Sequence, residues 1–80
     1  MVLSLSDNKS AAKDLDQAVQ LDPRSLRAWA SRGLAYERLG QKDKAAGSYA
    51  KALNINDKYQ PAKDGFARVG GKVGQVYPTF

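Results

Sequence analysis

Residues 26–57, LRAWASRGLAYERLGQKDKAAGSYAKALNIND, decide the fold of this 80-residue chain. Apolar and small side chains recur in this stretch every three or four residues, first from Trp29 to Tyr36 and then from Ala45 to Ala52. Such spacing places each set along one face of an α-helix. The stretch therefore predicts two consecutive helices that bury these faces against each other.

The same periodicity continues on both sides of this stretch. Asp22-Pro23 is predicted to end a first helix, and Pro23 to start the next one, where its missing N–H costs nothing. Gly40 suits a left-handed cap after Leu39, and Gly70-Gly71 is predicted to end the last helix. No useful segment alternates with period two, so we expect an all-α fold of about four helices with antiparallel neighbours. The predicted helices cover residues 7–20, 24–39, 42–54 and 58–69.

The sequence also repeats itself at an interval of 34 residues. The matched pairs are Leu5 with Leu39, Ser6 with Gly40, Ala11 with Ala45, Leu15 with Tyr49, Ala18 with Ala52, and Val19 with Leu53. This interval is typical of helix–turn–helix repeats. In this register residues 1–5 are only the last turn of a preceding helix, and Ser6 lies at a turn.

The apolar and small residues at these spacings resemble the sequence pattern of the tetratricopeptide repeat. The positions that carry the resemblance are Pro23, Trp29, Gly33, Tyr36, Ala45, Tyr49 and Ala52. The resemblance implies antiparallel helix-turn-helix repeats stacked as a right-handed superhelix. It places one complete repeat at about 26–57 and a capping helix at about 58–69. We expect one domain over residues 1–69 and a flexible C-terminal tail over residues 70–80.

Two features of the sequence differ from what a complete repeat array of this family would show. Arg32 stands where the family often has leucine, and we expect its stem to pack while its guanidinium reaches water. Leu15 and Val19 have no earlier helix to cover them, which predicts an apolar end. The chain is therefore expected to be the C-terminal piece of a longer array or a protomer that self-associates.

The composition excludes several classes of function. Cysteine and histidine are absent, which excludes disulfides, zinc fingers and imidazole chemistry. The acidic residues are seven aspartates and Glu37, and each is predicted to be solvated at the surface. Asp14 and Asp16 do not face each other on a helix. We therefore predict no enzyme, no metal, no cofactor and no small-molecule substrate. No apolar run is long enough to span a bilayer, and the cytoplasm is the default expectation.

The resemblance implies a non-catalytic scaffold that binds a peptide or partner protein in a concave groove lined by the first helix of each repeat. The groove residues would be Arg27, Ser31, Leu34, Glu37, Arg38 and Arg68, with Ala30, Pro61, Asp64 and Gly65 beside them. The arginines could pair with carboxylates of an extended peptide, and Leu34 could take an apolar side chain.

Two other functions remain open at this point. One is a self-assembling structural repeat without a separate ligand. It is favoured by net charges of −2 on residues 1–23 and +7 on residues 24–80. The other is nucleic-acid binding through the basic C-terminal half. The lysines are spread around the predicted helices, so this function is the weaker expectation.

Overall fold

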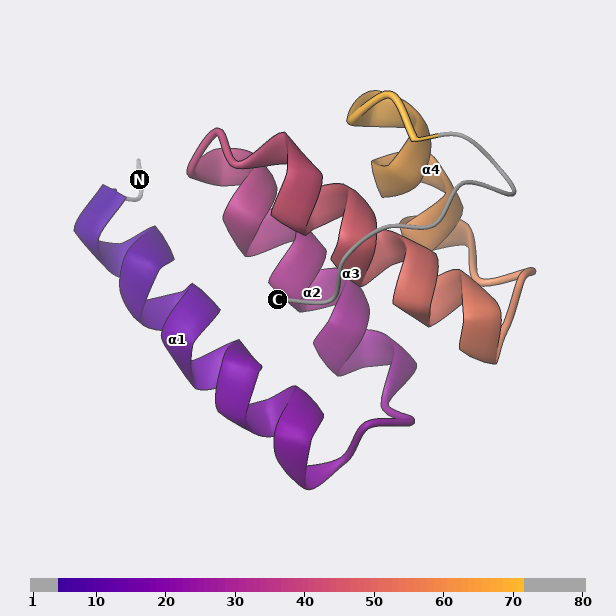
Figure 1. Cartoon of the computed structure of the whole chain (residues 1–80), viewed down its shortest axis with the longest axis horizontal. Helices are drawn as coiled ribbons and strands as arrows, with labels where there is room; N and C mark the ends of the chain where they lie inside the picture. Colours follow the sequence, from indigo (N-terminus) through magenta and orange to yellow (C-terminus); the bar gives the residue numbers. More distant parts are fainter. Residues whose placement is uncertain (1–4, 72–80) are drawn as a thin grey trace.

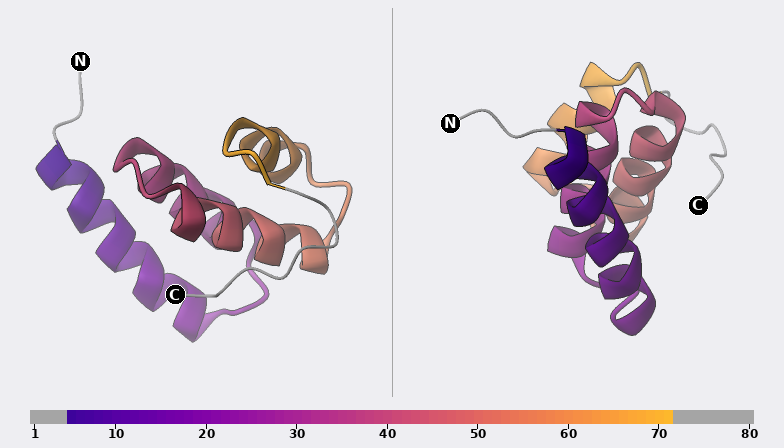
Figure 2. Two further views of the ribbon diagram at one scale, coloured as in Figure 1. Left: turned by 45° about the horizontal axis from the view of Figure 1, so that its top comes forward. Right: turned by 90° about the vertical axis from the view of Figure 1, so that its left-hand side faces the viewer.

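The computed structural model describes residues 5–71, and all regular secondary structure in this part of the chain is α-helical. The helices are α1 (Leu5–Leu21), α2 (Leu26–Arg38), α3 (Lys42–Ile55) and α4 (Gln60–Arg68). They stack in chain order, each antiparallel to the one before it, with α2 also contacting α4 (Figures 1 and 2). The predicted all-α fold of four helices is confirmed.

The turn between α1 and α2 differs from the prediction. Pro23 does not start α2 but lies in the turn, and α2 begins three residues later at Leu26. Ser25 provides the N-cap, because its Oγ accepts a hydrogen bond from the Ala28 N–H at 3.2 Å. Serine satisfies an orphan N–H of the first turn, which proline in that role cannot do. The Pro23 carbonyl instead accepts a hydrogen bond from the indole N–H of Trp29 at 2.8 Å.

Gly40 forms the predicted left-handed cap, and Gly70 forms a cap of the same kind at the predicted end of the last helix. Gly40 and Gly70 have positive φ angles of 78° and 74°. The residue after each glycine donates its N–H back into the helix, Gln41 to the Tyr36 carbonyl at 2.9 Å and Gly71 to the Phe66 carbonyl at 2.8 Å. This pattern closes the last turn of α2 and of α4 in the same way. Residues 72–80, most of the predicted tail, lie outside the described residues.

The start of α1 differs from the expectation, based on the 34-residue repeat, that a helix ends at residue 5 and a turn follows at Ser6. Leu5 and Ser6, predicted to end one helix and to turn, both lie inside α1, which runs without interruption to Leu21. Serine cannot replace Gly40 at this point in the register, because the left-handed cap needs a backbone conformation that favours glycine. Without that cap, nothing in the sequence ends a helix at Ser6.

Tyr49 of α3 lies at the centre of the core. A Cβ atom added to Gly33 would come within 2.8 Å of the Tyr49 ring, and one added to Gly65 would meet the same ring. The ring therefore occupies space that two glycines leave open, one on α2 and one on α4. The family-signature positions on α2 and α3 are all buried: Trp29, Gly33, Tyr36, Ala45, Tyr49 and Ala52.

Arg32 is the main departure from the predicted packing. Its side chain is 1% exposed, so the guanidinium does not reach water as expected. Its Nε donates to Asp16 Oδ1 of α1 at 2.6 Å, and its Nη1 donates to Ser48 Oγ of α3 at 2.6 Å. The Tyr36 hydroxyl also lies 3.0 Å from Asp16 Oδ2. These partners replace water, so Asp16 is a packing residue and not only the solvated surface group that was predicted.

The expectation of an apolar end at α1 is wrong for Val19, which is buried in the core. Leu15 is partly buried and packs against that core. The large apolar side chain that is exposed among residues 8–21 of α1 is Leu21, at 87%. One flank of α1 thus packs against α2.

Candidate functional site

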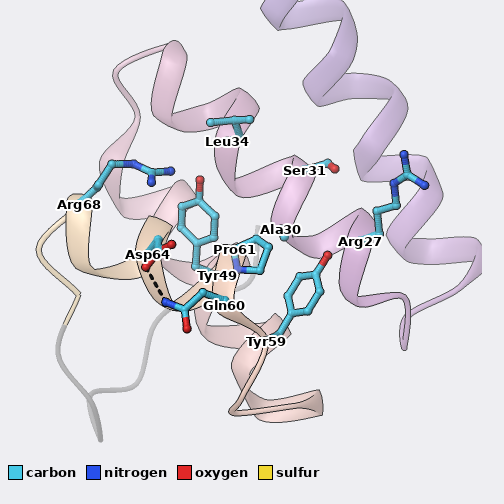
Figure 3. Close-up of a pocket in the computed structure, with 10 residues that line it drawn as sticks. All are labelled: Arg27, Ala30, Ser31, Leu34, Tyr49, Tyr59, Gln60, Pro61, Asp64 and Arg68. Carbon is cyan, nitrogen blue, oxygen red and sulfur yellow. Dashed lines mark hydrogen bonds between the residues drawn. The ribbon is translucent and has the colours of Figure 1, made fainter.

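A groove with a volume of about 520 Å³ lies between α2 and α4. Its lining residues are Arg27, Ala30, Ser31, Leu34, Tyr49, Tyr59, Gln60, Pro61, Asp64 and Arg68. Figure 3 shows Arg27 and Arg68 at opposite ends of this groove, with Tyr59 and Pro61 between them. The volume suits one or two side chains of a ligand better than a whole folded partner.

The repeat architecture explains why α2 and α4 form this groove. Each is the first helix of a hairpin, and α3 packs against both of them on one side. On the open side α2 presents Arg27, Ala30, Ser31 and Leu34, which are spaced three and four residues apart. The two small residues in the middle leave the hollow, and the long side chains at the ends define its length.

One end of the groove is closed by an ion pair. Arg68 Nε lies 3.0 Å from Glu37 Oε2, and Arg68 Nη2 lies 3.2 Å from Glu37 Oε1. The Tyr49 hydroxyl donates to Glu37 Oε1 at 2.9 Å. The bidentate geometry fixes both long side chains. At this end the arginine charge is therefore already matched by a carboxylate of the same molecule.

The electrostatics of this end follow from those contacts. The hydrogen bonds from Arg68 lower the pKa of Glu37, against a smaller opposing effect of burial. Burial, together with the hydrogen bond to Glu37, raises the pKa of Tyr49 to about 12. Glu37 is consequently a carboxylate and Tyr49 a neutral hydroxyl at physiological pH. The network therefore holds one negative charge on Glu37 and one positive charge on Arg68.

The other end of the groove carries an unmatched cation. Arg27 is exposed, and its guanidinium forms no ion pair or hydrogen bond with the residues that the structure describes. Tyr59 lies beside it in the groove (Figure 3). Tyr59 occupies the N-cap position of α4 without a side-chain cap, and its half-buried side chain packs against the core while also lining the groove. This end combines a free positive charge with an aromatic surface and a hydroxyl.

The structure brings together most, but not all, of the predicted groove residues. Those that line the groove are Arg27, Ala30, Ser31, Leu34, Pro61, Asp64 and Arg68. Glu37, which was predicted both to line the groove and to be solvated, is not in the lining and instead forms an ion pair with Arg68. Arg38 is exposed near the end of α2 and is not in the lining, and Gly65 is buried against Tyr49.

Three lining residues were missed by the sequence analysis: Tyr49, Tyr59 and Gln60. Tyr49 was assigned to the core alone, although its hydroxyl reaches the groove. The 34-residue register offers a signal for Tyr59, because it aligns with the capping Ser25. A tyrosine at an N-cap position does not satisfy the helix N-terminus, which suggests another role for its side chain.

Antiparallel helices that stack in chain order and leave a groove along their first helices define an α-helical repeat module. A family model for the tetratricopeptide repeat matches residues 3–61. The match covers well over half of the chain, so the protein belongs to the tetratricopeptide repeat family. The repeats of this family are non-catalytic modules that generally mediate protein–protein interaction. Neither a curated protein nor a solved structure matches the chain.

Two further features concern residues 5–71 only. None of the helices in this segment is both long and apolar enough to cross a lipid bilayer. The segment also brings no three histidine, cysteine, aspartate or glutamate side chains close enough to hold a metal ion.

Proposed function

We propose that the groove between α2 and α4 binds an extended peptide segment of a partner protein. The observation that carries this proposal is the asymmetry of the groove. Arg68 is already paired with Glu37, whereas Arg27 at the opposite end is free of ion pairs with the described residues. An acidic side chain or a C-terminal carboxylate of the peptide pairs with Arg27.

The residues in the middle of the groove determine which side chain of the peptide can bind next to that carboxylate. Ala30, Leu34 and Pro61 give an apolar lining, and Tyr59 adds an aromatic ring. Such a surface accepts one aliphatic or aromatic side chain of the ligand. The preferred peptide segment therefore has an acidic group a few residues away from an apolar side chain. One acidic group is enough, because Arg68, the other arginine in the lining, is already paired with Glu37.

The test begins with peptides selected from a random displayed library against the 80-residue chain. Binding of the enriched peptides is measured by fluorescence anisotropy with the unaltered chain, Arg27→Gln, and Arg24→Gln as a matched control. Arg24 is an exposed arginine in the preceding turn and lies outside the groove lining. We expect enrichment of acidic residues and a loss of affinity of about 10-fold or more in Arg27→Gln, because a charge-assisted hydrogen bond contributes about 1.5–3 kcal/mol.

Three results would contradict the proposal. One is that no peptide is enriched. A second is that Arg24→Gln weakens binding as much as Arg27→Gln does, which would indicate a diffuse effect of charge. The third is that the chain ignores peptides but binds single-stranded nucleic acid with an affinity that falls steeply with salt.

A further inference from the structure

The two second helices of the hairpins, α1 and α3, differ in how well the same positions are covered. Ala45 and Ala52 of α3 are completely buried, and Tyr49 between them is 1% exposed. Their counterparts on α1, 34 residues earlier, are Ala11, which is exposed, and Leu15 and Ala18, which are partly buried. On α3, Tyr49 of this set packs against Gly33 of α2 and Gly65 of α4. Among the four helices, α1 contacts α2 alone.

Helix α4 has the reciprocal feature. It is the first helix of a hairpin, and residues 5–71 include no second helix that packs against it as α3 packs against α2. Ala67 of α4 corresponds to Gly33 of α2 in the 34-residue register. Gly33 is buried against Tyr49, whereas Ala67 is exposed. Within residues 5–71, therefore, no first helix pairs with α1 at one end of the stack, and no second helix pairs with α4 at the other end (Figure 2).

We propose that the incompletely covered face of α1, formed by the exposed Ala11 and the partly buried Leu15 and Ala18, binds α4 of a second copy of this chain. In that contact Ala67 of one copy lies on Leu15 of the next, as Gly33 lies on Tyr49 within each copy. The pair α4–α1 completes a hairpin across the two molecules. Because the two surfaces differ, the interaction is heterologous and extends head to tail.

Charge favours the same arrangement. Residues 5–22 contain four aspartates and two lysines, a net −2, whereas residues 57–71 contain three basic and two acidic residues, a net +1. Asp14 on α1 and Lys63 on α4 are both exposed, and neither forms an ion pair with a described residue. Opposite charges on the two ends steer unlike ends together and disfavour the pairing of two α1 faces.

The experiment uses two variants of the full chain, each of which blocks one surface with the same charge. Ala18→Glu alters the α1 face, and Ala67→Glu alters α4. Mass is measured by sedimentation equilibrium from micromolar to millimolar concentration. We expect the mass of the unaltered chain to rise with concentration above 8.7 kDa, and each variant alone to keep the mass of one copy. An equimolar mixture of the variants retains one intact contact and gives twice that mass.

The matched control is Gln20→Glu, an exposed residue two positions from Ala18 and therefore about 200° around the helix. It should associate like the unaltered chain. Circular dichroism confirms that each variant is folded, and Ala11→Glu on the same face replaces Ala18→Glu if that variant unfolds. The proposal is overturned if the unaltered chain keeps the mass of one copy throughout, as it would if the α1 face served only another segment of the same polypeptide. It is also overturned if Ala67→Glu alone still associates, or if the mixture does not.

Discussion

Two arginines of this chain form the same kind of cluster in opposite surroundings. Arg32 pairs with Asp16, whose carboxylate also binds the Tyr36 hydroxyl, and Arg68 pairs with Glu37, whose carboxylate also binds the Tyr49 hydroxyl. The Arg32 side chain is 1% exposed, whereas that of Arg68 is 50% exposed. The comparison shows that burial decides whether such a cluster holds helices together or shapes a surface.

The buried cluster connects three helices. Arg32 on α2 reaches Asp16 on α1 and Ser48 on α3, and its guanidinium carbon lies 4.9 Å from the Tyr36 ring centroid. A desolvated guanidinium is costly unless such partners compensate for the lost water. Because the partners come from different helices, the cluster specifies how α1 sits on the α2–α3 hairpin. Arg68 can exchange its partner for water at much lower cost.

The largest expected effect comes from removing the acidic partner of the buried arginine. Asp16→Ala leaves Arg32 without its carboxylate and should lower the free energy of unfolding by about 2 kcal/mol. Asp14→Ala, at an exposed position of the same helix, is the matched control and should change it by less than about 0.5 kcal/mol. Urea denaturation followed by circular dichroism measures both. Equal, small effects in the two variants would remove the proposed role of Asp16.

A smaller effect is expected at the exposed cluster. Arg68→Ala should lower the free energy of unfolding much less than Asp16→Ala does, because solvent screens the half-exposed ion pair. The same denaturation experiment measures it. A loss as large as that of Asp16→Ala would show that the two clusters are equivalent and that the comparison fails.

The smallest expected effect is a dependence of stability on pH that comes from Glu37. Its pKa in the folded protein lies below the ordinary value of 4.5 because Arg68 donates hydrogen bonds to the carboxylate. This interaction stabilises the folded state above pH 4.5, and the stabilisation is lost as the pH falls through the folded-state pKa. Glu37→Gln should therefore have a shallower loss of stability with acid than the unaltered chain. Parallel acid profiles for the two proteins would contradict this assignment.

The parts of the fold that were predictable from sequence are those fixed by local residues. Gly40 and Gly70 end helices where their backbone freedom is needed, and the spacing from Trp29 to Ala52 identifies a helix hairpin. The start of α2 was placed too early, because Pro23 was given the role that Ser25 performs. Pro23 and Ser25 lie two residues apart, and either could mark the start of a helix. The hydrogen bond that Ser25 accepts from the Ala28 N–H places the N-cap of α2 at Ser25.

The remaining errors concern contacts between distant residues. Arg32 meets Asp16 and Ser48, which lie 16 residues before and after it, and no spacing rule within one helix indicates that all three converge. In the groove, the α2 residues followed from the resemblance to the tetratricopeptide repeat, which places the first helix of each repeat along a groove. Tyr59 did not, because it belongs to a turn whose direction depends on how α4 packs.

The central claim is that the groove between α2 and α4 is the surface that binds a partner. Amide chemical-shift mapping of the isotope-labelled chain with a selected peptide tests it most directly. We expect the largest shifts at Arg27, Ser31, Leu34 and Asp64, with little change in the α1 residues that pack on α2. Shifts concentrated on α1 or on the α2–α3 turn, with those four groove amides unchanged, would contradict it.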